Sequence, residues 1–595
     1  MKLEDYAIIG DTHSVALVGR TGSIDWLCLP RFDSPAFFAA LLGRPEHGHY
    51  SIRPVGEPRA IRRRYREDSL ILETEYVTDE GSVRVVDGMP IRGRHPDIVR
   101  IVEGIDGAVP MRVELVIRFD YGHIVPWLRA ADGCLHAISG PSALVISTPI
   151  ELRGDKHGLS AEMTVRKGDR LPFVLTWRPS YEAMTEEVRP FDAIEKADRW
   201  WRDWAQRARM SGPYRDMVVR SLLTLKALTY APTGGILAAP TTSLPEHLGG
   251  VRNWDYRSCW LRDSTFTLFA LMHAGYMDEA KAWSEWLLRA AGGDPGDLQT
   301  VYGPAGERDL TEHSVDWLPG YAGSRPIRIG TKAAKQFQID IYGEVLNTQH
   351  WARDMGFHTE PDAWVLQRDL GEWLASHWRE DDNGLWEIHG DRRPYVHSKV
   401  MAWVAMDRLT RAIERDGFDG PVERFRRTRQ EIHDDVCEKG FDRELGSFTQ
   451  SYGAKVLDAS GLLIPMVGFL PADDPRVQGT IAAIERHLVQ DGLVFRYATH
   501  DDEDNVDGLP GREGAFIACT FWLVNALTLC GRHDDACKVF EGAIAIANDV
   551  GLLSEEYDVE RSCLVGNFPQ ALSHLTLVNA ARNLAGADTG VRRGQ

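Results

Sequence analysis

The sequence predicts a two-domain protein in which an N-terminal antiparallel β-sandwich precedes an (α/α)6 toroid. Three observations predict this fold class. The chain has 595 residues, which is long for a single domain. Its first ~190 residues alternate short β-rich runs with turn signals, whereas the remainder carries helical periodicity. The joins between the helical segments alternate between long and short, as they do when antiparallel helix pairs form a ring.

Residues 1–190 are predicted to form the β-sandwich. The run SLILETEYVTDEGSVRVVDGMP at 69–90 and the run VRIVEGIDGAVPMRVELVIRFDYG at 99–122 are rich in β-branched residues. Each run contains a hairpin-turn signal, DEGS in the first and DGAVP in the second. Many short strands at regular spacing favour a sandwich.

Residues 191–212 are predicted as a helical linker, because FDAIEKADRWWRDWAQRARM is amphipathic. The toroid is expected to occupy residues 213–590. Its segments, about twelve in number, are expected to begin near residues 215, 263, 278, 337, 360, 397, 420, 459, 473, 513, 532 and 568.

The joins in the predicted toroid differ in length, and the long ones are expected at 236–262, 293–336, 380–396, 439–458, 492–512 and 550–567. If successive helices run antiparallel, every long join lies at the same end of the ring. Long loops inside a compact domain are usually functional. We therefore expect the functional site at this long-loop rim.

The composition bears on the class of partner and on the compartment. The net charge is -19 at pH 7, whereas nucleic acid and anionic membranes attract basic patches, so we expect neither as a partner. The opening MKLEDYAIIGDTHS has no basic segment before an apolar core, and we predict no signal peptide. The 8 cysteines are scattered without a CxxC pair, which favours free thiols and a cytoplasmic protein.

The stretch NWDYRSCWLRDSTF, which ends the first long join, mixes aromatic and fork-shaped polar side chains. Trp254, Tyr256 and Trp260 alternate there with Arg262 and Asp263. Sugar sites need this mixture, because ring C–H faces pack on indoles and hydroxyls take paired hydrogen bonds. The alternative is structural, with Asp263 as a helix N-cap and Arg262 as its partner.

Two glutamates stand in apolar surroundings on separate long joins. Glu387 follows Trp386 in NGLWEIHG, and Glu555 follows Leu553 in GLLSEEYD. Desolvation raises the pKa of a carboxyl that must hold a proton near neutral pH. Two carboxyls on one rim are typical of a glycosidase pair. Alternatively, Glu387 forms a rim salt bridge and GLLSEEYD is a solvated acidic turn, in which Glu556 and Asp558 compete with Glu555.

Weaker candidates also fall on the rim. Trp317 and Tyr321 are interpreted as a sugar wall, and Arg328 as a group that reaches a hydroxyl. The others, for which core packing or capping is the competing interpretation, are Gln336, Asp340, Tyr342, His397, Lys399 and Glu513. Glu513 is also a rival to Glu555.

Other chemistries lack their motifs in this sequence. GRTGS has neither the lysine nor the strand–helix setting of a P-loop. The chain contains no GxSxG, no HExxH and no paired-cysteine zinc site. We therefore expect no cofactor and no metal ion.

Several of these stretches together resemble a known family. YAIIGDTHSVALVGRTGSIDWLCLPRFDSPAFFAALLG, NWDYRSCWLRDSTF, FQIDIYGEVL, GLWEIHG with YVHSKVMAW, EGAFIACTFWLV and GLLSEEYD occur in the order found in bacterial members of glycoside hydrolase family 15. The resemblance covers nearly the whole chain. It implies a β-sandwich followed by an (α/α)6 barrel, and hydrolysis of α-glucosides with inversion.

The resemblance also implies roles for particular residues. Glu387 matches the family's general acid and Glu555 its general base, kept ionised. The pair Arg262–Asp263 matches the pair that grips the non-reducing glucose, and Trp260 and Trp386 line the same subsite. Many glucoamylases carry a second Glu after the acid, where this chain has Ile388. WEI followed by a glycine is similar to the trehalase branch.

The predicted function is therefore that of an inverting, exo-acting α-glucoside hydrolase that releases glucose, with α,α-trehalase favoured. The two carboxyl groups should then lie ~6.5–9.5 Å apart. The alternatives are a glucoamylase or isomaltase acting on maltooligosaccharides or isomaltose, a glycoside phosphorylase, and a carbohydrate-binding protein without catalysis. The expected partner is a small α-glucoside, and the oligomeric state, including a homo-oligomer, stays open.

Overall fold

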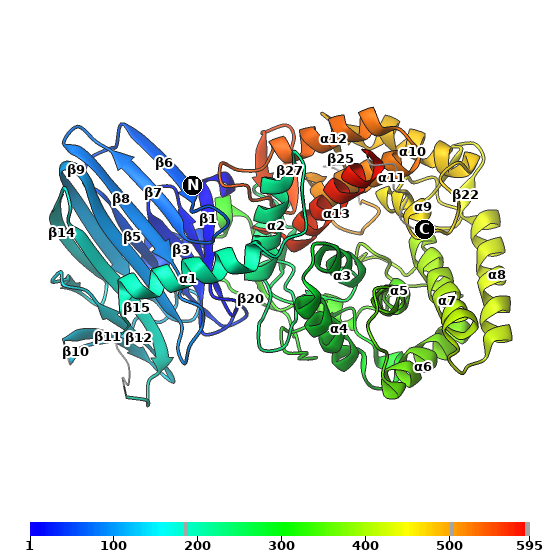
Figure 1. The fold of residues 1–595 in the computed structure, drawn as a ribbon, viewed down its shortest axis with the longest axis horizontal. Coiled ribbons are helices and arrows are strands. Elements are labelled where there is room, and N and C mark those ends of the chain that lie inside the picture. Colours follow the sequence, from blue (N-terminus) through cyan, green and yellow to red (C-terminus); the bar gives the residue numbers. More distant parts are fainter. Residues whose placement is uncertain (132, 184–187, 500–504, 589–595) are drawn as a thin grey trace.

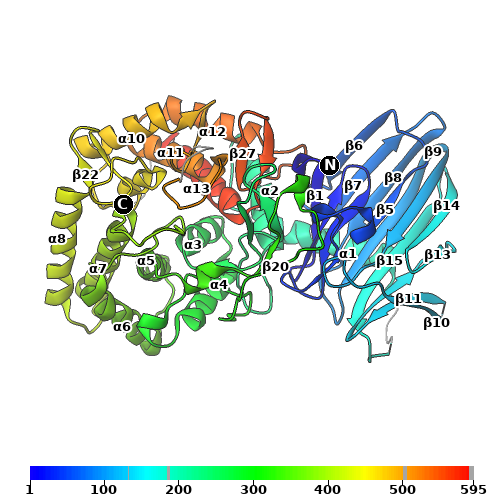
Figure 2. The ribbon, with the colours of Figure 1, turned by 180° about the vertical axis from the view of Figure 1, so that it is seen from behind.

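The computed structural model describes residues 1–131, 133–183, 188–499 and 505–588. A β-rich domain and a helical domain lie side by side, with helix α1 (Pro190–Ala205) running from one to the other (Figure 1). The same arrangement is seen from behind in Figure 2. The predicted fold class is confirmed.

The N-terminal domain consists of antiparallel strands whose central member is β9 (Asp97–Val116). The first half of β9 pairs with β8 and β15, and its second half pairs with β5 and β14. One long strand therefore belongs to both layers of the sandwich. The strands other than β9 are β1 (Tyr6–Gly10), β2 (Val15–Gly19), β3 (Ser23–Cys28), β4 (Ala36–Phe38), β5 (His49–Pro54), β6 (Ala60–Tyr65), β7 (Leu72–Val77), β8 (Gly81–Gly88), β10 (Trp127–Ala131), β11 (Cys134–Ser139), β12 (Ser142–Ser147), β13 (Arg153–Asp155), β14 (Gly158–Arg166) and β15 (Arg170–Pro179).

One of the two hairpin signals in the sequence lies where the chain turns between strands. DEGS joins β7 to β8, with Val77 opposite Ser82. The second signal, DGAVP, does not end a strand, because β9 runs through it as one continuous strand. At that point β9 passes from one layer to the other, and Gly107 pairs with Gly81 in a left-handed conformation that favours glycine.

Helix α1 is amphipathic as predicted, and its two ends contact different domains. Ile194 and Ala197 pack with residues of the sandwich, including Val99. Further along, the ring of Trp204 stacks on Tyr276 of the helical domain at a centroid distance of 4.0 Å. The domain limits of 1–190, 191–212 and 213–590 stay predictions.

The helical domain contains the expected segments near their expected starts. The helices after α1 are α2 (Arg215–Ala227), α3 (Ser264–His273), α4 (Met277–Ala291), α5 (Asp340–Asp354), α6 (Pro361–His377), α7 (Val396–Asp416), α8 (Val422–Lys439), α9 (Leu463–Met466), α10 (Pro475–His487), α11 (Ile517–Leu529), α12 (His533–Ala545) and α13 (Ala571–Asp588). The segment expected near 459 is short, a 3-10 turn at Ala459–Leu462 followed by the single turn of α9.

Six of these helices form an inner ring. Helix α3 packs against α5, α5 against α7, α9 against α11, α11 against α13, and α13 returns to α3. Arg408 of α7 donates a hydrogen bond to the carbonyl of Val467, just beyond α9, which closes the remaining gap. Helices α5, α7 and α11 are buried on nearly all sides, as helices enclosed by a second ring must be.

Two further properties of the chain follow from the structure. All eight cysteines lie in the described segments, and each is a free thiol. Among the residues that the structure describes, no helix has the length and hydrophobicity needed to span a membrane.

Candidate active site

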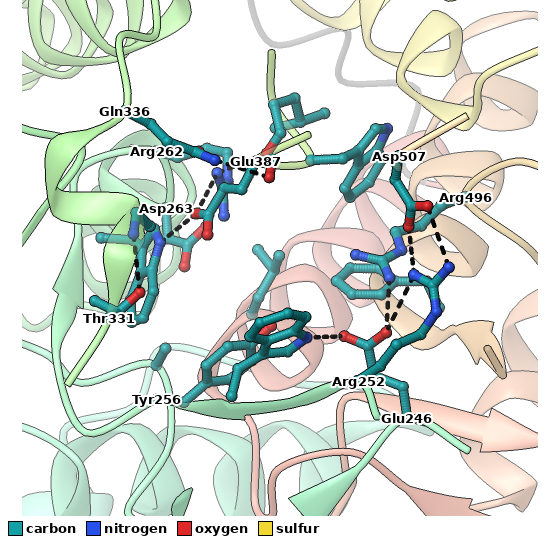
Figure 3. A pocket seen from close by; sticks show the side chains of 18 of the residues that line it. Glu246, Arg252, Tyr256, Arg262, Asp263, Thr331, Gln336, Glu387, Arg496 and Asp507 are labelled. Atoms are coloured by element: carbon teal, nitrogen blue, oxygen red, sulfur yellow. Dashed lines mark hydrogen bonds and ion pairs between the residues drawn. The ribbon is translucent and has the colours of Figure 1, made fainter. Parts of the chain in front are cut away.

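A cavity lies on the axis of the helical ring, at the end where the long joins gather. Each inner helix supplies one lining side chain, and these are Phe266, Glu344, His397, Leu463, Trp522 and Leu572. The walls come from the long joins, which contribute among others Trp260, Gln336, Glu387, Arg496 and Gln570. In Figure 3, Arg262, Asp263 and Glu387 face Glu246, Arg252 and Arg496 across the cavity.

Glu387 lines the cavity and is held by two donors. The indole Nε1 of Trp260 donates to its Oε1 at 2.5 Å, and Nη1 of Arg262 donates to the same oxygen at 3.2 Å. The backbone of Glu387 is left-handed, with φ at 58°. For a residue other than glycine this conformation costs on the order of 1–3 kcal/mol, and such strain gathers at functional sites.

Asp263 and Arg262 lie at the start of α3. Arg262 is fixed by the carbonyl of Leu385, to which Nη1 donates at 2.6 Å. The alternative that Asp263 caps α3 is wrong, because its side chain makes no capping hydrogen bond. Its buried Oδ1 has no hydrogen-bond partner within the described residues. Burial raises the pKa of Asp263 to about 6, although Arg262 opposes the increase. An unpaired carboxylate oxygen in a cavity is available to a sugar hydroxyl.

Trp386 forms a rigid wall beside Glu387. Its Nε1 donates to both carboxylate oxygens of Asp458, at 3.0 and 2.9 Å. Its ring also contacts Phe516 and Trp522, with centroids at 5.5 and 5.9 Å. Both aromatic groups predicted for the glucose subsite, Trp260 and Trp386, therefore line the same cavity.

Glu555 lies immediately behind the cavity wall and is fully buried. The hydroxyl of Tyr256, which lines the cavity, donates to Oε1 of Glu555 at 2.5 Å. Oxygens of Glu246, Glu555 and Glu556 lie within 4.8 Å of one another. Burial, followed by the charge of Glu246, raises the pKa of Glu555 to about 8.

In the free protein, the surroundings of Glu555 therefore favour its protonated form at neutral pH. The sequence-based expectation is an ionised carboxylate. Three buried carboxyls this close cannot all ionise without a large electrostatic cost. The hydrogen bond from Tyr256, the charge of Arg496 and the backbone N–H of Asn567 all lower the pKa of Glu555. Its ionisation depends on these three groups.

Two buried guanidinium groups balance the acidic cluster. Nη2 of Arg496 donates to Glu513 at 2.6 Å and to Glu246 at 3.2 Å, and lies 3.4 Å from Glu556. Arg252 pairs with Asp507 through two hydrogen bonds and also reaches Glu513 at 3.4 Å. The trio Glu246, Glu555 and Glu556 has the spacing of a cation site, but these arginines already supply the positive charge.

Sequence reasoning missed several charged residues at this cavity, and four of them form its buried charged side: Glu246, Arg252, Arg496 and Asp507. Arg252 and Arg496 each stand near an aromatic residue, in VRNWD and FRYATH. Each of the four lies on a join that the sequence marks as long. Loop length combined with a charged residue near an aromatic one is a signal that could have identified Arg252 and Arg496, whereas Glu246 and Asp507 carry only the signal of loop length. Glu513, considered only as a capping acid or rival base, belongs to the same cluster.

Two proposed sugar contacts lie elsewhere. The hydroxyl of Tyr321 donates to the carbonyl of Met1, at a separate cavity beside the sandwich. Trp317 is 41% exposed, and its Nε1 donates to the carbonyl of Tyr121. The prediction that Tyr321 and Trp317 form a sugar wall is therefore wrong, because their loop turns toward the N-terminal domain.

Arg328 supports the cavity wall from behind instead of lining it. Its guanidinium lies 4.4 Å from the ring centre of Trp254 and donates to the carbonyls of Val251 and Asn253. Trp254 itself lines the cavity, and its Nε1 donates to Glu246 at 2.8 Å. The prediction of a direct contact between Arg328 and the sugar is replaced by an indirect one.

The remaining weak candidates divide into two groups. Gln336 and His397 line the cavity, and Nε2 of Gln336 donates to the carbonyl of Glu387 at 3.0 Å. In contrast, Lys399 donates to backbone carbonyls at the end of α6, including that of Trp378. Tyr342 donates to the carbonyl of Pro295. These last two have structural roles.

Asp340, another candidate, is buried beneath the site. Neither of its carboxylate oxygens has a hydrogen-bond partner among the described residues. Burial raises the pKa of Asp340 to about 7, and the negative charge of Asp382 is the second cause of this increase. A carboxyl in this setting favours its protonated form at and below neutral pH.

The two acidic neighbours that compete with Glu555 for the role of base have other partners. Asp558 pairs with Arg561 at 2.8 Å, away from the cavity. Glu556 accepts a hydrogen bond from the N–H of Gly514 and joins the charged cluster.

Ile388 is 1% exposed and is absent from the cavity wall. No side chain at that position supplies the second carboxylate that glucoamylases place beside the next sugar.

Two carboxylates, an arginine–aspartate pair and indole walls at the open end of a helical toroid define a glycoside hydrolase. The chain belongs to glycosyl hydrolases family 15, whose family model matches residues 212–582. A second family model, the trehalase-like N-terminal domain, matches residues 1–201. The resemblance seen in the sequence is thereby confirmed.

Individual relatives agree with this assignment over nearly the whole chain. The trehalase of Mycobacterium tuberculosis is 36% identical, covering 98% of this chain and 90% of that protein. The trehalase of Thermoplasma volcanium is 33% identical, covering 98% and 93%. Among solved structures, a bacterial glucoamylase complexed with acarbose shares the fold, with a TM-score of 0.71, 13% identity and coverage of 98% and 94%.

Proposed function

We propose that this protein is an inverting, exo-acting α,α-trehalase. The observation that supports the proposal is that Glu387 lines the cavity and Glu555 lies behind its wall, each accepting a hydrogen bond from an aromatic side chain of the stretch 254–263 that lines the cavity. The similarity to proteins named trehalase supports the choice of substrate. The proposed substrate is small and uncharged, in keeping with a cavity of indoles and fork-shaped polar groups.

In the proposed mechanism, Glu387 is the general acid and Glu555 the general base. Glu387 donates a proton to the oxygen between the two glucose rings, which leaves with the departing glucose. Glu555, once ionised, takes a proton from a water molecule that attacks the anomeric carbon from the opposite face. Inversion needs space for that water, so the carboxyl groups should lie about 6.5–9.5 Å apart.

The glucose that is attacked is proposed to lie beside Arg262 and Asp263. Asp263 offers an unpaired carboxylate oxygen, and Arg262 is held in place by the carbonyl of Leu385. Trp260 and Trp386 provide apolar faces for the ring. Since Arg262 also bonds to Glu387, the group that grips the sugar and the group that protonates it are fixed relative to each other.

The departing glucose is proposed to contact Trp254 and His389. The ring of His389 stacks on Trp254 with centroids 5.2 Å apart, and both residues line the cavity. The backbone N–H of His389 donates to the carbonyl of Asp507, which joins two loops at this side of the cavity. Within the described residues, the imidazole nitrogens of His389 have no hydrogen-bond partner, so they are available to a sugar hydroxyl.

The free thiols suit a reducing compartment, and we propose a cytoplasmic location. Retention of all eight thiols by the protein isolated from its own cells, without an oxidised form, would agree with this. A disulfide in the isolated protein would contradict it.

A substrate screen on the purified full-length protein tests the proposed function. Trehalose, maltose, isomaltose and soluble starch are supplied separately, with and without inorganic phosphate, and products are followed by NMR. Trehalose should be hydrolysed fastest without phosphate, giving one β-glucose and one α-glucose before mutarotation. Preference for maltose, isomaltose or starch would indicate a glucoamylase or isomaltase. Phosphate-dependent formation of glucose phosphate would indicate a phosphorylase, and binding without turnover a non-catalytic protein.

A further inference from the structure

The β-sandwich contacts the two segments that hold the proposed general base. We propose that it is a positioning domain for catalysis, acting through Arg63 and Arg257. Arg63 fixes the join that carries Glu555, and Arg257 fixes the residue next to Tyr256. This inference rests on the proposed function, because Glu555 is the general base in that function.

The join that carries Glu555 is fastened to the sandwich at its beginning. Arg63, on β6, has a fully buried side chain and makes hydrogen bonds of 2.6 to 3.0 Å to Asp549. Beside it, Nδ2 of Asn548 donates to the carbonyls of Tyr6 and Glu4, at 2.8 and 3.2 Å. These two anchors stand six and seven positions before Glu555 in the sequence.

The same join is fastened to the sandwich again after Glu555. The backbone N–H of Leu564 donates to the carboxylate of Glu4 at 3.1 Å. Between the two anchors, β27 (Glu556–Asp558) and β28 (Cys563–Val565) form a hairpin that starts directly after Glu555. The first residues of the chain therefore hold both ends of the segment that presents the base.

Arg257 connects the sandwich to the donor of the hydrogen bond on Glu555. It is fully buried, pairs with Asp255 through two hydrogen bonds of 2.9 and 2.7 Å, and donates to the carbonyl of Ser34 in the sandwich. Its guanidinium also lies 5.4 Å from the ring centre of Tyr121. Tyr256, between Asp255 and Arg257, faces the cavity and bonds to Glu555.

A third connection reaches Glu555 through the backbone. The indole Nε1 of Trp26, on β3, donates to the carbonyl of Pro240 at 2.8 Å. The next residue, Thr241, donates from its hydroxyl to Asn567 at 2.9 Å. The N–H of Asn567 in turn approaches Oε2 of Glu555 at 3.4 Å. Three independent routes thus lead from the sandwich to one carboxylate.

The position of a catalytic carboxylate directly affects the rate of turnover. A displacement of about 1 Å in a catalytic group can cost on the order of 100-fold in turnover. The base is more sensitive than the acid to loss of the sandwich contacts, because all three routes lead to Glu555. Glu387 is held by Trp260, Arg262 and Gln336, all within the helical domain.

The test uses Arg63→Gln and Arg257→Lys in the full-length protein, with Arg31→Gln as the matched control. Arg31 forms an ion pair of 2.8 Å with Glu307 across the same boundary between domains, but it does not contact the base segment. Each variant is assayed on trehalose, which needs both acid and base, and on α-glucosyl fluoride, whose leaving group needs no proton. Thermal unfolding shows which variants are folded.

Folded Arg63→Gln and Arg257→Lys should lose about 10- to 100-fold in kcat on both substrates, with little change in KM. The acidic limb of their kcat/KM profile against pH should also move to higher pH. Arg31→Gln should retain the wild-type kcat. Wild-type kcat in both variants, or an equal loss in Arg31→Gln, would overturn the inference. Failure of the wild-type protein to hydrolyse any α-glucoside would instead overturn the proposed function. If Arg63→Gln does not fold, Arg257→Lys decides.

Discussion

Tyr256 and Trp260 stand edge to face, with ring centroids 5.3 Å apart, and each donates a hydrogen bond to a different candidate catalytic carboxylate. Tyr256 contacts Glu555, and Trp260 contacts Glu387. Glu387 and Glu555 are 168 positions apart in the chain, but two neighbouring aromatic side chains fix both. One short stretch of sequence therefore contacts both the proposed acid and the proposed base.

Replacing either carboxylate should abolish most turnover of trehalose, but the two replacements should differ on an activated substrate. Glu387→Gln and Glu555→Gln are each expected to lower kcat on trehalose by about 10²- to 10⁴-fold. On α-glucosyl fluoride, Glu387→Gln should retain much of its activity, because fluoride leaves without a proton. Glu555→Gln should remain inactive, because water still needs a base.

The comparison of the two substrates separates the two roles. Asp558→Asn is the matched control, since Asp558 is an acidic neighbour in the same segment that pairs with Arg561. It should hydrolyse both substrates like the wild type. Near-normal activity of Glu555→Gln on the fluoride would contradict its role as base.

Removing the hydroxyl of Tyr256 should change the pH dependence of the reaction. Its hydrogen bond stabilises the ionised form of Glu555 and so lowers the pKa of that carboxyl, against the effect of burial. In Tyr256→Phe the pKa of Glu555 should rise. Because the base must be ionised, the acidic limb of the kcat/KM profile should move to higher pH. The loss of activity should therefore be larger at low pH than at high pH.

A kinetic pH series on wild type and Tyr256→Phe measures this shift. Tyr230→Phe serves as a control, since Tyr230 packs near the sandwich boundary against Phe32 and does not contact Glu555. An unchanged acidic limb in Tyr256→Phe would show that Glu555 does not determine that limb.

His389 should affect only substrates with a sugar as leaving group. His389→Ala is expected to lower kcat/KM for trehalose by up to about 10-fold, because one hydrogen bond contributes on the order of 1 kcal/mol. Hydrolysis of α-glucosyl fluoride should stay at the wild-type level, because fluoride does not occupy the second subsite. His358→Ala, at an exposed position, is the control. Equal losses on both substrates would assign His389 to the first subsite instead.

The sequence was sufficient for the fold and for one side of the cavity. Helical period and loop length are local properties, so the starts of α2 to α13 and the long joins could be predicted. Glu387, Arg262 and Trp260 could be found because they form compact motifs. The position of Tyr321 could not be predicted, because the direction of a long loop depends on its contacts with the other domain.

The second side of the cavity is a long-range property. Arg252 and Asp507 form a buried ion pair although 255 positions separate them. A sequence shows that each residue is charged but not which partner neutralises it. The same limit applies to Glu555, because the charges that alter its pKa come from Glu246 and Arg496 on other joins.

Glu344 should reduce the stability of the folded protein as the pH rises. This carboxyl on α5 is buried and accepts a hydrogen bond from Thr265 at 2.6 Å. Burial raises its pKa from the ordinary value of 4.5 to about 8. Below the ordinary value, folded and unfolded chains both hold the proton. Between the two values only the folded chain does, so its stability falls by up to about 1.4 kcal/mol per pH unit.

Glu344→Gln should remove that loss, since an amide keeps the acceptor for Thr265 without a charge. Thermal unfolding midpoints measured at about pH 5 and about pH 8 compare the variant with the wild type. The variant should gain stability relative to the wild type on going to the higher pH, and the gain should level off above the raised pKa. Glu438→Gln, an exposed position on α8, should show no such gain. A difference between Glu344→Gln and wild type that is the same at both pH values would mean that Glu344 is ionised in the folded protein throughout this range.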